Sequence, residues 1–136
     1  MKLLLKGGRV VDPASGRDGE FDVAHSSLVL HHLDGDDARR LLRELARVAR
    51  LGVVVNDLER GIAPWVGAWL LLHAMSRNPF TLHDGPLSVR RAFTRPEMQG
   101  LLGDAGLRPV AEVRGFAGHR TAIAAVHSDA QAAGAR

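Results

Sequence analysis

Residues 21–59, FDVAHSSLVLHHLDGDDARRLLRELARVARLGVVVNDLE, decide the fold expected for this chain. The stretch opens with a short apolar-rich run, residues 21–26, and closes on residues 53–55, three valines typical of a strand buried on both faces. Between the two runs, apolar side chains recur at the spacing of an amphipathic helix: Ala38, Leu41, Leu42, Leu45, Val48 and Ala49. The order predicts strand, helix and strand, the crossover unit of a parallel sheet.

The ends of this helix carry their own signals. Asp34 is the expected N-cap, and Asp36 and Asp37 place negative charge against the positive end of the helix. Gly52 is expected to end the helix.

Polar side chains follow both predicted strands. Ligands of parallel sheets bind outside the carboxyl ends of the strands, so we expect a site at these residues. They are His25, Ser26 and Ser27 in the first strand, and Asn56, Asp57 and Glu59 in the second.

The same stretch resembles part of a known family. The matching pieces are Phe21-Asp22-Val23, then Leu30-His31-His32-Leu33, and the helix over residues 42–48. They resemble the C-terminal half of a class I S-adenosylmethionine-dependent methyltransferase of the small-molecule type, and the likeness continues to about Val126. The resemblance implies an α/β fold: a partial Rossmann-like methyltransferase sheet with an antiparallel strand pair at its C-terminal end. It also implies S-adenosylmethionine as cofactor and a small-molecule methyl acceptor.

Four residues are candidates for catalysis. His31 or His32 has the chemistry of a general base, and the alternative is a packed turn that lines the pocket floor. Asn56 and Asp57 can position an acceptor hydroxyl, and the alternative is a strand-to-loop transition. His25, Ser26 and Ser27 are the candidate cofactor contacts.

A metal site is the other chemistry that histidines suggest. His25, His31 and His32 stand near Asp34, but adjacent histidines point in different directions and these histidines form no i, i+4 pair. We therefore predict no metal.

Residues 1–20 follow a different pattern. They read MKLLLKGGRVVDPASGRDGE and predict two short strands around Gly7-Gly8. This segment resembles the amino terminus of dihydroorotase and related cyclic amidohydrolases, whose His-x-His metal motif is absent here. We interpret the chain as a chimera joined near residues 21–23. Its parts are an amidohydrolase-like β segment (1–20), a methyltransferase-like half-domain (21–127) and a disordered tail (128–136).

The features that hold the methyl donor are not found in the sequence. A class I methyltransferase uses a glycine-rich loop after its first strand and an acidic residue after its second. Gly7-Gly8 precede a short strand rather than a helix, and no acidic position can be assigned. We therefore expect impaired methyl transfer. The alternatives are a non-enzymatic truncated or interaction module and a dihydroorotase-like hydrolase fragment.

The first three strands of the methyltransferase fold are not recognisable in the sequence either. We therefore expect the predicted strand over residues 21–26 to lie at an open sheet edge. Such an edge pairs readily with another strand. We expect residues 2–6, residues 9–11 or a second copy of the chain to pair with it, the last giving a homodimer.

The remaining elements are predicted from local signals. Ile62–Met75 is an apolar helix that should be buried or packed on a partner, and residues 78–92 form a loop rich in breakers. Thr94-Arg95-Pro96-Glu97 is a capping box that opens a helix ending at Gly106. Residues 107–116 and 121–127 should form an antiparallel pair.

Composition limits the partners and the compartment. The formal charge is +3, and arginines on the outer face of the central helix indicate a solvated face rather than a phosphate site. Aromatic residues make up 4% of the chain, too few for a stacking platform, so we predict no nucleic acid partner. The chain has no cysteine and no apolar stretch long enough to span a bilayer. We expect a cytoplasmic protein.

Overall fold

The computed structural model describes residues 4–6, 9–12, 17–19, 21–115 and 118–128. The predicted disordered tail, residues 128–136, lies outside this range except for Ser128, as does the end of the strand predicted to reach Phe116.

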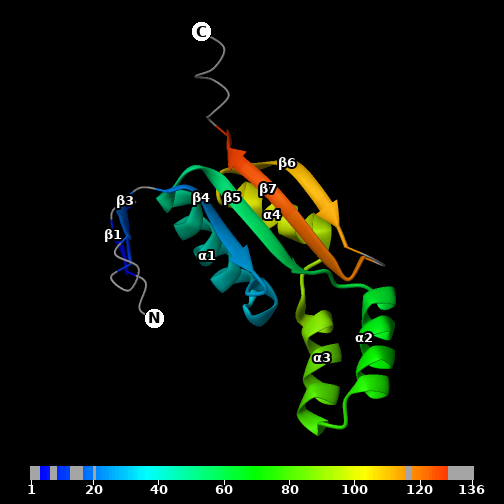
Figure 1. Cartoon of the computed structure of the whole chain (residues 1–136). Helices are drawn as coiled ribbons and strands as arrows, with labels where there is room; N and C mark the ends of the chain where they lie inside the picture. The colour runs from blue at the N-terminus through cyan, green and yellow to red at the C-terminus, as the bar shows by residue number, and fades with distance from the viewer. Residues whose placement is uncertain (1–3, 7–8, 13–16, 20, 116–117, 129–136) are drawn as a thin grey trace.

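A four-stranded sheet forms the centre of the molecule. β4 (Phe21–Ser27) pairs in parallel with β5 (Ala49–Leu58), as the crossover pattern predicts. β7 (Arg120–His127) lies antiparallel to β5, and β6 (Leu107–Arg114) lies antiparallel to β7. The strand order is therefore β4-β5-β7-β6 (Figure 1). The expected partial Rossmann-like sheet with a C-terminal antiparallel pair is confirmed.

Two helices cover one face of this sheet. α1 (Gly35–Val48) starts at Asp34, whose side chain accepts from the backbone N–H groups of Asp36 and Asp37. α4 (Arg95–Asp104) lies beside it, behind the sheet in Figure 1. Apolar side chains of α1, α4 and the sheet form one core, with members that include Ala38, Leu42, Val53, Val55, Met98, Leu102 and Ile123.

The predicted end of the central helix is wrong. α1 ends at Val48, and Gly52 lies inside β5 instead. A Cβ on Gly52 would lie 2.1 Å from the carbonyl oxygen of Ala125 on the neighbouring strand β7. The absence of a side chain at Gly52 lets β5 and β7 lie this close together. From the sequence alone, the same glycine is interpreted as the end of a helix.

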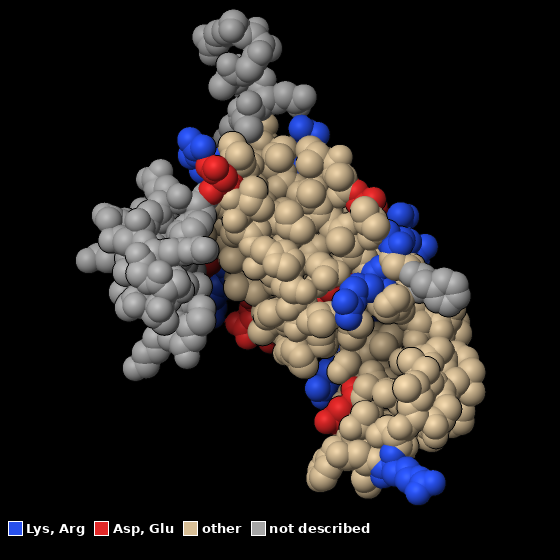
Figure 2. Space-filling model, viewed as in Figure 1, with Lys and Arg blue, Asp and Glu red and all other residues tan. Residues whose placement is uncertain are grey.

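The valine run of β5 is covered on one face only. Val53 and Val55 are 1% exposed, whereas Val54, which points the other way, is half-buried. The face that carries Val54 is turned to the viewer in Figure 1, and no helix of the described chain covers it. Figure 2, in the same view, shows a broad uncharged surface across the sheet, with charged side chains mainly around its periphery.

A helical hairpin extends from one end of the sheet. α2 (Ile62–Met75) confirms the predicted apolar helix, and it packs against α3 (Pro79–Arg91) (Figure 1). The loop predicted for residues 78–92 is wrong. Asn78 caps α3 by accepting from the backbone N–H of Phe80, and Pro79 occupies the first turn, where its missing N–H is harmless.

Gly85 is a helix breaker that lies inside α3, and the packing of α2 explains its presence there. A Cβ at this position would lie 2.1 Å from Cδ1 of Leu72 on α2. The absent side chain therefore lets the two helices approach, a packing role that composition alone does not show.

The local signals around α4 are confirmed. Thr94 and Glu97 form the predicted capping box, and Gly106 beyond the helix has a φ of +75°, the left-handed conformation that favours glycine. The hydrogen bond from the backbone N–H of Thr94 lowers the pKa of Glu97; burial opposes this shift, and further hydrogen bonds from Thr94 and Arg60 add to it.

The amino-terminal strands form a sheet of their own. β1 (Leu4–Lys6) and β2 (Arg9–Asp12) make the predicted hairpin, and β3 (Arg17–Gly19) adds a third strand. The expectation that these residues pair with the open edge of β4 is wrong for the described strands, because the two sheets are separate. None of the described helices is long and apolar enough to cross a membrane.

Candidate functional site

The carboxyl ends of β4 and β5 lie side by side. Ser26 pairs with Val55 and Ser27 with Asn56 in the parallel register. Leu28 then turns the chain with a φ of 56°, a conformation rare for a non-glycine residue, and its backbone N–H donates to the carbonyl of Asn56 at 2.9 Å. A short 3-10 helix, η1 (Leu30–His32), follows. Strained backbone next to strand ends is a common feature of functional sites.

Asp57 organises this turn from the neighbouring strand. Its Oδ2 accepts from the backbone N–H groups of Val29 at 2.9 Å and Leu30 at 2.7 Å, and its Oδ1 accepts from that of Leu58 at 2.7 Å. The residue is 1% exposed. A buried carboxylate needs such donors, so Asp57 fixes η1 against the end of β5.

His31 completes the arrangement. Its Nδ1 lies 2.5 Å from Oδ1 of Asp57, and the residue is 6% exposed. An ionised carboxylate has no proton to donate, so we assign the donor role in this contact, and with it the ring proton, to Nδ1 of His31. The remaining ring nitrogen, Nε2, then has a lone pair that can accept a proton. We call His31 and Asp57 the histidine–aspartate pair.

The other predicted site residues differ in their exposure and in their contacts. His32 is exposed, and its ring centroid lies 4.0 Å from that of His31. Asn56 donates from Nδ2 to Oγ of Ser27 at 3.2 Å. His25 is exposed, whereas Ser26 is buried and its Oγ has no hydrogen-bond partner. The structure thus brings His31 and Asp57 into contact and leaves His25 outside that contact.

A second buried carboxylate, Glu59, lies just beyond β5. Arg114 donates to it from Nε at 2.9 Å and from Nη2 at 2.6 Å, and Thr121 donates from Oγ1. Burial raises the pKa of Glu59, but the hydrogen bonds from Arg114 and Thr121 and the charge of Arg114 outweigh it, so that the pKa is lowered. The cluster joins the end of β5 to the β6–β7 pair. This role of Glu59 was not predictable from the sequence, because Arg114 and Thr121 lie 55 and 62 residues further along the chain.

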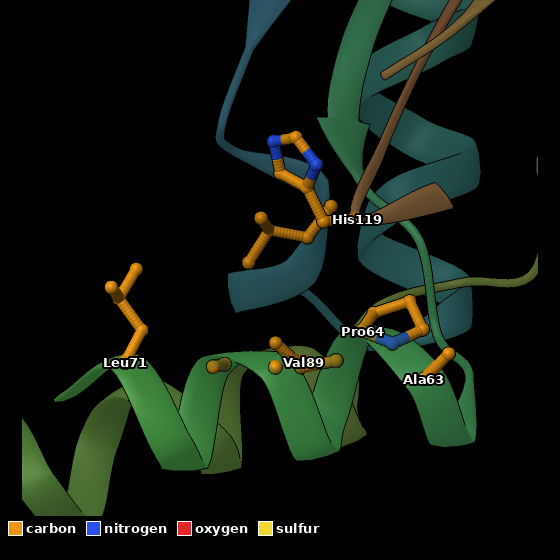
Figure 3. A pocket seen from close by; sticks show the side chains of 8 residues that line it. Ala63, Pro64, Leu71, Val89 and His119 are labelled. Atoms are coloured by element: carbon orange, nitrogen blue, oxygen red, sulfur yellow. The ribbon is translucent and has the colours of Figure 1, made fainter. Parts of the chain in front are cut away.

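An apolar groove lies between α2 and the end of β5. We call it the α2 groove, and its volume is about 460 Å³. In Figure 3, Ala63, Pro64 and Leu71 of α2 line one side, with Val89 of α3 behind them and His119 on the opposite side. Leu58, the last residue of β5, lines it as well. The sequence did not predict the groove, although an apolar helix with no charged side chain was a signal that something must cover it.

The residues at this edge fit S-adenosylmethionine, the cofactor implied by the resemblance, only in part. The two buried carboxylates, Asp57 and Glu59, are both engaged by protein donors, so neither can hold the hydroxyls of a ribose. Ser26 offers one buried hydroxyl without a partner. Within the described ranges these residues do not make a complete site for the cofactor. The same ranges contain no group of three His, Asp or Glu side chains arranged to hold a metal ion.

Comparison with known sequences gives one family. The sequence model described as "Methyltransferase domain" matches residues 8–55, and the match includes the histidine of the pair and the two parallel strands up to Val55. It begins inside the segment that resembles dihydroorotase. No curated protein sequence matches the chain significantly.

Solved structures share the fold. Mitomycin 7-O-methyltransferase is 22% identical with a TM-score of 0.54, and the match covers 79% of this chain and 30% of that one. Magnesium protoporphyrin IX methyltransferase from Synechocystis PCC 6803, with bound SAH, is 15% identical with a TM-score of 0.53, covering 81% and 46%. An O-methyltransferase family 2 protein from Planctomyces limnophilus, in complex with apigenin, is 19% identical with a TM-score of 0.53, covering 77% and 30%.

The aligned region thus spans less than half the length of each of these structures. Sequence and fold together confirm the resemblance of this chain to the C-terminal part of a class I S-adenosylmethionine-dependent methyltransferase.

Proposed function

We propose that this chain provides the acceptor side of an S-adenosylmethionine-dependent methyl transfer to a hydroxyl group of a small molecule. The observation that carries the proposal is the 2.5 Å contact between His31 and Asp57 at the carboxyl ends of the two parallel strands. The family match and the fold shared with named O-methyltransferases support it.

The histidine–aspartate pair performs the proton chemistry. Methylation of a hydroxyl oxygen releases the proton of that hydroxyl, and Nε2 of His31 is the acceptor for it. Asp57 holds Nδ1–H and so fixes the ring orientation and stabilises the imidazolium that forms. Asn56, on the same strand, orients the acceptor. His25, Ser26 and Ser27 line the donor side.

Comparison of two neighbouring histidines tests this role. We expect His31→Ala to lower the rate of methyl transfer from radiolabelled S-adenosylmethionine to 2-naphthol by about 10²–10⁴-fold, the usual contribution of a general base. His32→Ala is the matched control, because His32 is exposed and has no contact with Asp57 among those of the described residues. Equal rates for the two variants would contradict the assignment.

Impaired activity is part of the proposal. The chain should bind S-adenosylmethionine weakly, because its carboxylates at the strand ends are engaged by the protein itself. Titration calorimetry measures this directly. A micromolar dissociation constant, worth about −8 kcal/mol, would contradict the impairment. Absence of any methyl transfer at millimolar donor would instead favour a non-enzymatic role.

One observation favours a second candidate, an interaction module. β4 is an edge strand, and in the described sheets its outer side pairs with no other strand. Val23 on β4 is 49% exposed. We propose that two copies of the chain pair through this edge. Light scattering should show a concentration-dependent dimer that Val23→Lys disrupts, since edge lysines block pairing.

β6 supplies the control for this test. It is the other edge of the sheet and already carries Arg108, Pro109, Glu112 and Arg114. Val113→Lys should leave the dimer unchanged, although Val113 is 69% exposed. Three other expectations stay predictions: the hydrolase alternative, the joint near residues 21–23 and the cytoplasmic location.

A further inference from the structure

One side of α2 is an apolar surface in contact with solvent. Its residues recur at positions i, i+4, i+7 and i+8, so they share one side of the helix: Ile62, Val66, Trp69 and Leu70. All four are at least 40% exposed, and Ile62 reaches 84%. No element of the described chain covers them, whereas Leu72, outside this stripe, packs against α3 at Gly85. We call these four residues the α2 outer face.

Both ends of the α2 outer face carry an arginine. Arg77 follows the C-terminal end of α2, and Arg90 lies beside its N-terminal end, where it lines a hollow together with Ile62 and Trp65. Both arginines are exposed, and neither forms an ion pair within the described ranges. Residues 62–91 contain three arginines and one acidic residue, Asp84. The hairpin thus combines exposed apolar surface with unpaired positive charge.

The α2 outer face points away from the sheet. In Figure 3, Pro64 and Leu71 of α2 extend towards His119, which lies on the sheet side of the helix. From Ile62 to Leu71 the helix makes about two and a half turns, so Ile62 is on the opposite side. Figure 2 shows the hairpin as a largely uncharged lobe with basic atoms at its free end. An extended surface can therefore meet the α2 outer face without meeting the sheet.

The chemistry of this face fits the surface of a lipid bilayer. With 14 residues, α2 is about 21 Å long, too short for the hydrocarbon layer of about 30 Å. A helix of this kind lies in the plane of the interface, with its apolar side chains below the lipid headgroups. Tryptophan is favoured at that depth, and arginines at the helix ends can extend their side chains to the lipid phosphates.

A second copy of the chain fits the same face less well. Two α2 helices that pair through it, whether parallel or antiparallel, would place an arginine of one copy next to an arginine of the other. Like charges in contact oppose association. The anionic phosphates of a membrane instead complement both arginines.

We infer that α2 lies in the surface of a membrane that contains anionic lipid, with the α2 outer face in the acyl region and Arg77 and Arg90 at the phosphates. This contact goes beyond the proposed methyl transfer and does not depend on it.

Tryptophan fluorescence reports the contact directly. Trp65 and Trp69, both on α2, are the two tryptophans of the chain. The probes are vesicles of phosphatidylcholine and phosphatidylglycerol in equal amounts, and vesicles of phosphatidylcholine alone, mixed with the whole chain. We expect a blue shift of the emission and sedimentation of the chain with the anionic vesicles, and binding at least about tenfold weaker to the neutral ones, since each arginine near an anionic surface contributes about fivefold.

A charge placed on the α2 outer face tests its role. Leu70→Glu should weaken binding to the anionic vesicles at least about tenfold. Val113→Glu is the matched control: Val113 is 69% exposed, lies on β6 and should change binding by less than about twofold. Ile62→Glu repeats the test at a second exposed position, should Leu70→Glu fail to fold by circular dichroism. Arg77→Gln should weaken binding to anionic vesicles about fivefold and leave binding to neutral ones unchanged.

Three results would overturn the inference: no binding of the wild type to anionic vesicles, equal binding of Leu70→Glu and Val113→Glu, or equal binding to the two kinds of vesicle. Light scattering without lipid distinguishes the other occupant. A concentration-dependent dimer that Leu70→Glu dissociates and Val23→Lys does not would assign the α2 outer face to a second copy and would also overturn the inference.

Discussion

Helices α1 and α2 have the same length, 14 residues, and opposite surroundings. α1 carries charged side chains along one face and buries the other against the sheet, where Leu42 is 0% exposed. α2 has no charged side chain, and yet Leu70 and Leu71 are 56% and 58% exposed. The more hydrophobic of the two helices is therefore the less buried.

The difference shows what hydrophobic pattern can and cannot predict. An apolar stripe with a polar opposite face predicts both that a helix packs and which side does so. A helix that is apolar all round predicts that something covers it, but does not say what. In the described chain only α3 packs along α2, through the contact of Leu72 at Gly85, and large apolar side chains remain in solvent.

The largest expected effect is in the covered region. Leu42→Ala removes a side chain that is fully buried between α1 and the sheet, and the cavity left behind adds to the lost burial. We expect the free energy of unfolding in urea to fall by about 2–5 kcal/mol. Leu70→Ala, the same change on α2, is the control and should lower it by well under half that amount. Equal losses would show that α2 is buried in solution.

An intermediate effect is expected at Glu59, which lies between the end of β5 and the start of α2. Because its folded-state pKa is lowered, Glu59 stabilises the fold above its unfolded pKa, about 4.3, and this contribution is lost as the pH falls through that value towards the folded pKa. Glu59→Gln should lower stability at pH 7 by about 1.5–3 kcal/mol, the range for hydrogen bonds to a charged group.

The pH dependence separates this charge effect from simple packing. In thermal melts, the difference between wild type and Glu59→Gln should shrink as the pH falls from 6 to 3. Glu44→Gln on the exposed face of α1 is the control and should follow the wild-type curve. A constant difference at all pH values would contradict the role of the Glu59 charge.

The sequence predicted those parts of the fold that local chemistry determines. The cap at Asp34, the capping box at Thr94 and the left-handed Gly106 are all signals read within one turn of chain. α3 was missed because its breakers serve other purposes: Pro79 sits in the first turn and Gly85 makes room for Leu72. Such roles depend on a second element, which composition does not reveal.

The candidate site also has parts that local sequence signals predicted and parts that depend on a second element. Asp57 was predicted from its position at a strand end, and His31 was predicted as one of two candidate bases in the segment after the first strand. The structure adds that the two residues touch across 26 residues of chain. The link from Glu59 to Thr121 needs the register of β5 on β7, which pairs Asp57 with Thr121 and was not predictable from spacing. The α2 groove likewise needs the hairpin packing of α2 on α3.

The smallest effect is expected at Trp69 on the outer side of α2. If α2 packed on the sheet, Trp69→Ala would cost about 3–5 kcal/mol as a core truncation. Trp69 is instead 42% exposed, and its ring lies 4.3 Å from that of His73 on its own helix. We expect a loss of roughly 1 kcal/mol or less in urea melts, since surface substitutions away from packed features change stability little. Fluorescence of the indole should shift little on unfolding, and Trp65, which is more buried, is the control. A loss above about 3 kcal/mol would mean that α2 is covered in solution, either by a second copy or by the sheet, and the contrast between the two helices would then disappear.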